Sequence, residues 1–189
     1  MEYLDYTYKH NYIEFSSSIY RVGTYTYNWH GGTEIFILLK GRVEMRCNDE
    51  TFTMEPLDVA IISPQVGHSI LALEDDVIAF VVQVGNEFYQ QYDPNFGMYE
   101  FVIRSDVSTR HNEFFTTLRH HAAMTMLLMN KGENPIYRMW IEHHYLALVG
   151  DVFREFDPVK KVHENARPGD IKPATFDKMI EYIDEHYQQ

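Results

Sequence analysis

The stretch that decides the fold is Asn28-Trp29-His30-Gly31-Gly32-Thr33-Glu34, together with Gly41, Asp58, Pro64 and His68 further along the chain. Residues two apart on a strand point to the same face, so Asn28 and His30 are expected to share one. Glu34 can return to that face after the Gly31-Gly32 bend, and a later strand contributes His68. Imidazole and carboxylate groups gathered in a concave interior suit iron, manganese, nickel or zinc. The pattern therefore predicts one polar site assembled from separate strands.

Short strands are predicted on both sides of this stretch. Alternation with a period of two residues runs through residues 22–30. One face of that segment carries Thr24, Thr26, Asn28 and His30. Apolar runs separated by polar turns continue to residue 84, and residues 85–109 are predicted to form a loop with a short strand at Met98–Ile103. Many short strands at regular spacing are typical of an all-β barrel or sandwich.

Two helices are predicted in the second half of the chain, over residues 111–130 and 136–156. Apolar residues recur at helical spacing in both, and Gly132 and Pro135 separate them. Each helix is apolar around much of its circumference, whereas a helix that only covers a sheet needs one apolar stripe. Two explanations are open, deeper burial within one chain or contact between two copies, and we favour the second. A homodimer through residues 111–156 is therefore expected.

A linker and one further helix are predicted toward the C-terminus. Residues 157–172 combine Pro158, Pro168 and Gly169 with many charges and few large apolar side chains. Residues 173–189 then show one amphipathic helical face. Its apolar residues are Phe176, Met179, Ile180, Ile183 and Tyr187.

Composition and charge argue against several classes of protein. The formal net charge of −12 disfavours a duplex-binding surface, which needs a basic face. The single cysteine, Cys47, excludes an internal disulfide framework and suits a reducing compartment. The N-terminus does not resemble a signal peptide, and no apolar run approaches the roughly 20 residues needed to cross a bilayer. We therefore expect a cytoplasmic protein with no membrane contact.

The spacing of these motifs resembles the cupin barrel, in the version found in the sensor half of AraC-type transcription regulators. The segment Ile180-Glu181-Tyr182-Ile183-Asp184-Glu185-His186-Tyr187 is similar to the opening helix of that family's DNA-binding half. The resemblance implies a mostly β protein with C-terminal α-structure, which would reach DNA only through a C-terminal domain missing from this chain. It divides the chain into a double-stranded β-helix barrel at 1–109, a helical dimerisation pair at 110–156, a linker at 157–172 and a first DNA-binding-domain helix at 173–189.

Inside the barrel, the resemblance implies a pocket for a small-molecule effector, with a sugar as one candidate. Cupins that bind metal usually have histidine where this chain has Asn28, and glycine where it has Leu57. Because neutral Asn is a poor ligand for transition metals, we expect no metal and no other cofactor. Any metal would be held by His30, Glu34 and His68. The predicted effector-binding residues are Thr24, Thr26, Asn28, His30, Glu34, Phe36, Leu38 and His68.

The function expected from the resemblance is ligand sensing and dimerisation in a transcription regulator, without enzymatic activity. A bound effector would shift the population between two arrangements of the N-terminal segment or of the helical pair. The alternative is a metal-dependent cupin enzyme, of the dioxygenase or isomerase type, that uses His30, Glu34 and His68. Two simpler interpretations also stay open: a binding module without any role at DNA, and polar residues that merely pair with one another.

Overall fold

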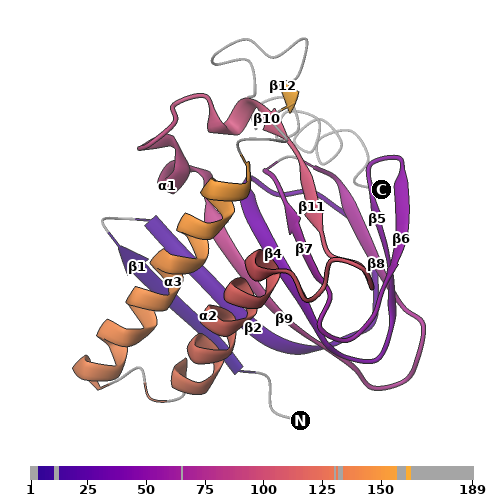
Figure 1. Ribbon diagram of the computed structural model, residues 1–189, viewed down its shortest axis with the longest axis horizontal. Helices are drawn as coiled ribbons and strands as arrows, with labels where there is room; N and C mark the ends of the chain where they lie inside the picture. The colour runs from indigo at the N-terminus through magenta and orange to yellow at the C-terminus, as the bar shows by residue number, and fades with distance from the viewer. Residues whose placement is uncertain are drawn as a thin grey trace, which may run out of the picture.

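The computed structural model of the chain describes residues 4–10, 13–64, 66–129, 131, 134–156 and 161–162. Within these residues, two antiparallel sheets pack against each other, and helices cover the outer face of the larger sheet (Figure 1). The predicted fold class, mostly β with helices toward the C-terminal side, is confirmed. No helix in the described part of the chain is long and apolar enough to span a membrane.

The central strands of the larger sheet, β9 (Val77–Gly85), β4 (Gly32–Lys40) and β7 (Val59–Ile62), are buried on both faces. The six strands of this sheet run in the order β1 (Leu4–His10), β2 (Ile13–Val22), β9, β4, β7 and β11 (Val102–Arg104). On β4, Ile35 and Ile37 pack with the helices, whereas Phe36 and Leu38 pack toward the smaller sheet. A strand covered on both sides needs apolar residues on both faces, which explains the continuous apolar run of β4.

The smaller sheet has one solvent-exposed face. Its strands run in the order β3 (Thr24–Asn28), β8 (His68–Ala72), β5 (Val43–Cys47) and β6 (Glu50–Met54). Burial alternates strictly along β5, where Val43, Met45 and Cys47 are buried and the residues between them are exposed. This alternation is typical of an antiparallel sheet with one solvated side. The buried side packs against β4 and β9 to form the core between the two sheets.

The two predicted helices are α2 (Glu113–Met129) and α3 (Pro135–Phe156), which pack against each other and against the larger sheet. Side-chain oxygens cap both N-termini. Asn112 accepts a hydrogen bond from the backbone N–H of Phe115, and Asn134 accepts one from that of Ile136. Pro135 occupies the first turn of α3, where its missing N–H costs nothing.

One stripe of α3 is not covered by the described part of the chain. Ile136, Met139 and Trp140 are 65%, 60% and 48% exposed, and Leu146 is exposed on the same side. Burial among the described residues therefore does not explain the apolar character of this stripe.

The segment between β9 and α2 is more ordered than the predicted loop. It contains α1 (Asn86–Gln90), the 3-10 helix η1 (Phe96–Met98) and β10 (Tyr99–Glu100), and the rings of Tyr89 and Phe96 stack at 4.2 Å. β10 pairs with β12 (Lys161–Val162), which lies inside the predicted linker. The other predicted linker residues and the predicted helix at 173–189 lie outside the described residues.

Candidate metal centre

Three strand ends bring His30, Glu34 and His68 together. Glu34 lies near the start of β4, His68 begins β8, and His30 lies in the turn between β3 and β4. That turn passes so close to β9 that a Cβ atom on Gly32 would come within 2.9 Å of the Val84 carbonyl oxygen. Glycine at this position therefore lets the turn pack against β9 and lets Glu34 return toward the site.

The three side chains place their ligand atoms within 4.8 Å of one another. The Nε2 atom of His30 lies 3.1 Å from Oε2 of Glu34, and the Nε2 atom of His68 lies 3.7 Å from Oε1 of the same carboxylate. Glu34 and His68 are 5% and 4% exposed, while His30 is half-buried at the rim. Among the described residues, His30, Glu34 and His68 are the one group of three or more histidine, cysteine or acidic side chains that lie close enough together to hold a metal ion.

Backbone carbonyls fix the orientation of both imidazoles. Nδ1 of His30 lies 2.9 Å from the Gly32 oxygen, and Nδ1 of His68 lies 3.1 Å from the Val66 oxygen. Because a carbonyl oxygen can only accept, each Nδ1 carries the hydrogen, and each Nε2 is directed at Glu34. Metal-binding histidines are commonly held in this way, through the ring nitrogen that does not bind the metal.

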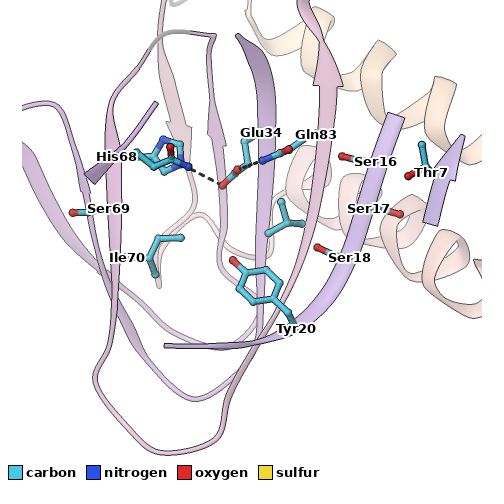
Figure 2. A pocket seen from close by; sticks show the side chains of 12 residues that line it. Thr7, Ser16, Ser17, Ser18, Tyr20, Glu34, His68, Ser69, Ile70 and Gln83 are labelled. Carbon is cyan, nitrogen blue, oxygen red and sulfur yellow. Dashed lines mark hydrogen bonds and ion pairs between the residues drawn. The ribbon is translucent and has the colours of Figure 1, made fainter. Parts of the chain in front are cut away.

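Gln83 is a site residue that the sequence-based predictions missed. Its Nε2 donates a hydrogen bond to Oε2 of Glu34 at 2.9 Å, and the two residues face each other across β9 and β4. Figure 2 shows Glu34 between His68 and Gln83. The available signal was a lone polar residue in the apolar run Val77–Gly85, but a polar residue in one strand does not reveal its cross-strand partner.

The electrostatics of the site favour an ion pair when no metal is bound. Burial alone lowers the pKa of His30, but the hydrogen bond to Glu34, the charge of Glu34 and the Gly32 carbonyl together raise it above its ordinary value. Burial alone raises the pKa of Glu34, but His30, the charge of His68 and the Gln83 amide together lower it. The carboxylate is therefore ionised near neutral pH, as a metal ligand must be.

A pocket of about 440 Å³ opens beside these residues. Glu34, His68 and Gln83 form one wall, and hydroxyl groups from β1, β2 and β8 line much of the remainder (Figure 2). The lining residues are Thr7, Ser16, Ser17, Ser18, Tyr20, Asn28, Glu34, His68, Ser69, Ile70, Val81 and Gln83.

The structure places the predicted pocket residues in three different environments. Asn28, Glu34 and His68 line the pocket, and His30 lies against Glu34 and His68 just beside it. Phe36 and Leu38 share the inward face of β4, as predicted, but they are fully buried in the core and do not line the pocket. Thr26 belongs to β3, and its side chain lies outside the described part of the structure.

The prediction that Thr24 shares a face with Asn28 is wrong. Thr24 is exposed and pairs with Leu71, which is itself 40% exposed, whereas Asn28 pairs with the buried His68. The register shifts between Tyr25 and Asn28, and one extra residue reverses the face to which each later side chain points. Simple alternation therefore fails across this bulge.

The donor set fits a transition metal. Two imidazole nitrogens and one carboxylate oxygen form the facial set typical of mononuclear non-haem iron, and the same donors also suit zinc or manganese. Asn28 lies next to His68 but is not needed to complete this set. Cys47 is also opposite His68, and burial raises the pKa of its thiol to about 12. These donors would suit a metal, and the expectation that the site holds none stays a prediction.

Comparison with known proteins gives one family match, within the β region. The family model of the cupin domain matches residues 20–84. This segment is therefore similar to a cupin domain. It contains the candidate metal-site residues and the buried residues of the core between the two sheets. No curated protein matches the chain. The finer resemblance, to AraC-type regulators, finds no support in these matches.

Several solved structures resemble the chain in fold. The DMSP lyase DddQ from Ruegeria pomeroyi is 18% identical, with a TM-score of 0.34, and the match covers 39% of this chain and 39% of the lyase. The Cnp3 cupin domain from Schizosaccharomyces pombe is 14% identical, with a TM-score of 0.39 and coverage of 50% and 72%. A cupin superfamily protein from Desulfitobacterium hafniense is 14% identical, with a TM-score of 0.37 and coverage of 45% and 79%.

These similar structures correct one prediction. The prediction that the chain lacks enzymatic activity is wrong as an exclusion, because the solved structures similar to it in fold include a lyase. At these identities the likeness is one of fold, so the substrate of the lyase says nothing about the ligand of this chain.

Proposed function

We propose that this chain is a metal-dependent cupin enzyme that acts on a small organic molecule, with His30, Glu34 and His68 as the metal ligands. One observation carries the proposal. Two imidazoles, each with its Nδ1 bound to a backbone carbonyl, direct their Nε2 atoms at the same buried carboxylate. Three protein donors leave coordination positions for substrate or water, which distinguishes catalytic metal sites from closed structural ones.

The pocket supplies what catalysis needs from the protein. A bound metal would provide Lewis acidity or redox chemistry, depending on the ion, and therefore isomerase-type or dioxygenase-type reactions. Ile70 and Val81 offer an apolar wall, and the hydroxyls of Ser16 and Ser18 offer donors and acceptors that can orient a substrate. Glu34 and His68 lie at one end of this space, so a molecule in the pocket would reach the metal ligands directly.

Metal analysis tests the proposal. The wild-type chain, incubated with iron(II), manganese, nickel or zinc and then desalted, is expected to retain a stoichiometric amount of at least one ion. His68→Ala should lose that ion, because the remaining pair of ligands binds weakly. His111→Ala, an exposed histidine on the loop before α2, is the matched control and should retain it. A wild-type chain that retains no ion under any of these conditions would overturn the proposal.

A second candidate function is effector sensing in an AraC-type regulator, and one contact favours it. Ser16 and Ser18 of β2 line the pocket, while Ser17 between them is hydrogen-bonded to Tyr145 of α3. One strand therefore forms a wall of the pocket and also contacts the helical pair. The two candidates differ in turnover: an NMR screen of metabolites against the metal-loaded chain should show conversion for an enzyme and only bound, unchanged ligand for a sensor.

We also propose that two copies of the chain associate through α3. The exposed stripe of Ile136, Met139, Trp140 and Leu146 supports this, because apolar side chains at helical spacing gain stability when another surface covers them. The wild-type chain should sediment as a dimer at micromolar concentration, and Trp140→Glu should sediment as a monomer. A monomeric wild type would exclude this interface.

A further inference from the structure

Gln83 lies on β9 where the strand pattern calls for an apolar residue. The inward-facing neighbours on this strand, Val77, Ala79 and Val81, all belong to the core between the sheets. Gln83 continues the same face and is half-buried at the edge of the pocket. A buried or half-buried amide is costly unless it is hydrogen-bonded, so the position of its partner is informative. That partner is Glu34.

The two oxygens of Glu34 are not equivalent. Oε2 accepts hydrogen bonds from His30 and from Gln83, whereas Oε1 faces His68 at 3.7 Å. An imidazole nitrogen that binds a metal uses its lone pair and carries no hydrogen to donate. With both histidines bound to a metal, the Gln83 amide would still donate to Glu34, because an amide N–H does not compete for the ion.

We propose that Gln83 is a positioning residue of the metal centre, which holds Oε2 of Glu34 so that the carboxylate offers Oε1 alone to the ion. This inference rests on the proposed metal-dependent function and deepens it. A carboxylate that binds through one oxygen occupies one coordination position rather than two. Gln83 would therefore set how many positions remain for substrate by acting through Glu34, without binding the metal itself.

The backbone register supports a fixed geometry for this contact. Glu34 pairs with Gln83 across β4 and β9, and Gln83 in turn pairs with Ser16 across β9 and β2. The strand that carries Gln83, β9, is thus paired on both sides, with β2 and with β4, in the central part of the larger sheet. Removal of such a hydrogen-bond partner typically lowers metal affinity by about 10- to 100-fold.

The test uses the full chain with cobalt(II) as the probe. Gln83→Met keeps the length of the side chain and removes the donor. Its cobalt affinity is expected to fall by about 10- to 100-fold, and its visible absorption should change because the number of ligands changes. Gln91→Met is the matched control, since it makes the same substitution at an exposed glutamine, at the end of α1, that does not line the pocket.

A second measurement needs no variant. Infrared difference spectra of the wild type, with and without cobalt, distinguish a carboxylate bound through one oxygen from one bound through two. Binding through one oxygen in the wild type is expected, and a two-oxygen signature would overturn the inference, as would a Gln83→Met protein with unchanged affinity and absorption. A wild type that binds no cobalt and none of the other ions would instead overturn the metal-dependent function, and this inference with it.

Discussion

The histidines between the two sheets and those between the two helices are buried or half-buried, yet their surroundings favour opposite charge states. Between the sheets, His30 faces the carboxylate of Glu34, which raises the pKa of the imidazole. Between α2 and α3, the Nδ1 atoms of His121 and His144 lie 3.0 Å apart. Burial, followed by the charges of His121, His143 and His120, lowers the pKa of His144 to about 4.

The difference shows that the partner, more than burial, decides what a histidine can do. A histidine beside a carboxylate is ready to exchange its proton for a metal ion. When two histidines are hydrogen-bonded to each other, at least one must stay neutral, because one ring has to accept the hydrogen that the other donates. His144 also leaves its buried Nε2 without a hydrogen-bond partner in the described part of the chain. The helical pair is therefore expected to lose stability in mild acid, whereas the ion pair of His30 and Glu34 is expected to persist until the pH falls through the lowered pKa of Glu34.

Removal of the carboxylate should break the comparison most strongly. In Glu34→Gln, His30 and His68 lose their carboxylate, so that neither set of histidines has a negatively charged neighbour at hydrogen-bond distance. Metal affinity is expected to fall by more than about 100-fold, because loss of a ligand costs more than loss of a residue that is only hydrogen-bonded to a ligand. Isothermal titration calorimetry measures the change. Glu44→Gln, on the exposed face of β5, is the control and should bind as the wild type does. Equal affinities for the two variants would contradict the metal centre.

Acid should destabilise the fold through His144. Its pKa is about 6.5 in the unfolded chain and about 4 in the folded chain. Between about pH 6.5 and about pH 4, the imidazole is therefore protonated in the unfolded state but neutral in the folded state. Stability is therefore lost as the pH falls from about 6.5 to about 4, by at most about 1.4 kcal/mol per pH unit. Urea unfolding of His144→Gln should show a flatter pH dependence than that of the wild type. The exposed His111→Gln should keep the wild-type slope.

His30 should show the opposite sign in the metal-free protein. Its pKa is raised in the folded state, so the stability from its pair with Glu34 is fully present below about pH 6.5 and is lost as the pH rises through the folded value. The lowered pKa of Glu34 sets the acid limit, below which the pair is lost again. His30→Gln should therefore cost roughly 1 kcal/mol at pH 6 and less at pH 8.5, with a chelator present. A cost that grows with pH would refute the pairing.

The smallest effect is expected at the hydrogen bond between Ser17 and Tyr145, which joins the larger sheet to the helical pair. Tyr145→Phe removes the hydrogen bond between α3 and Ser17 of β2, which should lower the free energy of unfolding by roughly 1 kcal/mol and leave metal affinity unchanged. Tyr92→Phe is the matched control, because Tyr92 is 69% exposed. A change in metal affinity for Tyr145→Phe would show that the helical layer influences the metal centre, as the sensing function requires.

Strand and helix periodicity made much of the fold predictable. The apolar runs of β4 and β9, the turn at Gly41 and the two helices follow directly from the pattern of side chains and from their capping residues. The grouping of His30, Glu34 and His68 could also be predicted, because the family spacing of these residues places them near strand ends that adjoin in the fold.

Other features depend on tertiary pairing that a single sequence does not reveal. The bulge in β3 changes the register by one residue, and nothing in the alternation of residues 22–30 marks it, so Thr24 was assigned to the wrong face. Phe36 and Leu38 were assigned to a pocket although the smaller sheet packs directly over them. Gln83 was missed because its role depends on a neighbour in another strand.

The contact between Glu34 and Gln83 also bears on how the protein is made. The two residues are 49 positions apart, and β9 is synthesised after all three proposed metal ligands. A nascent chain that has just emerged past His68 already carries every ligand, but the strand that orients Glu34 is still inside the ribosome. Pairing between strands so distant in sequence forms late, because a long loop must close first. Uptake of metal with full affinity would therefore mark the moment at which β9 has paired with β4.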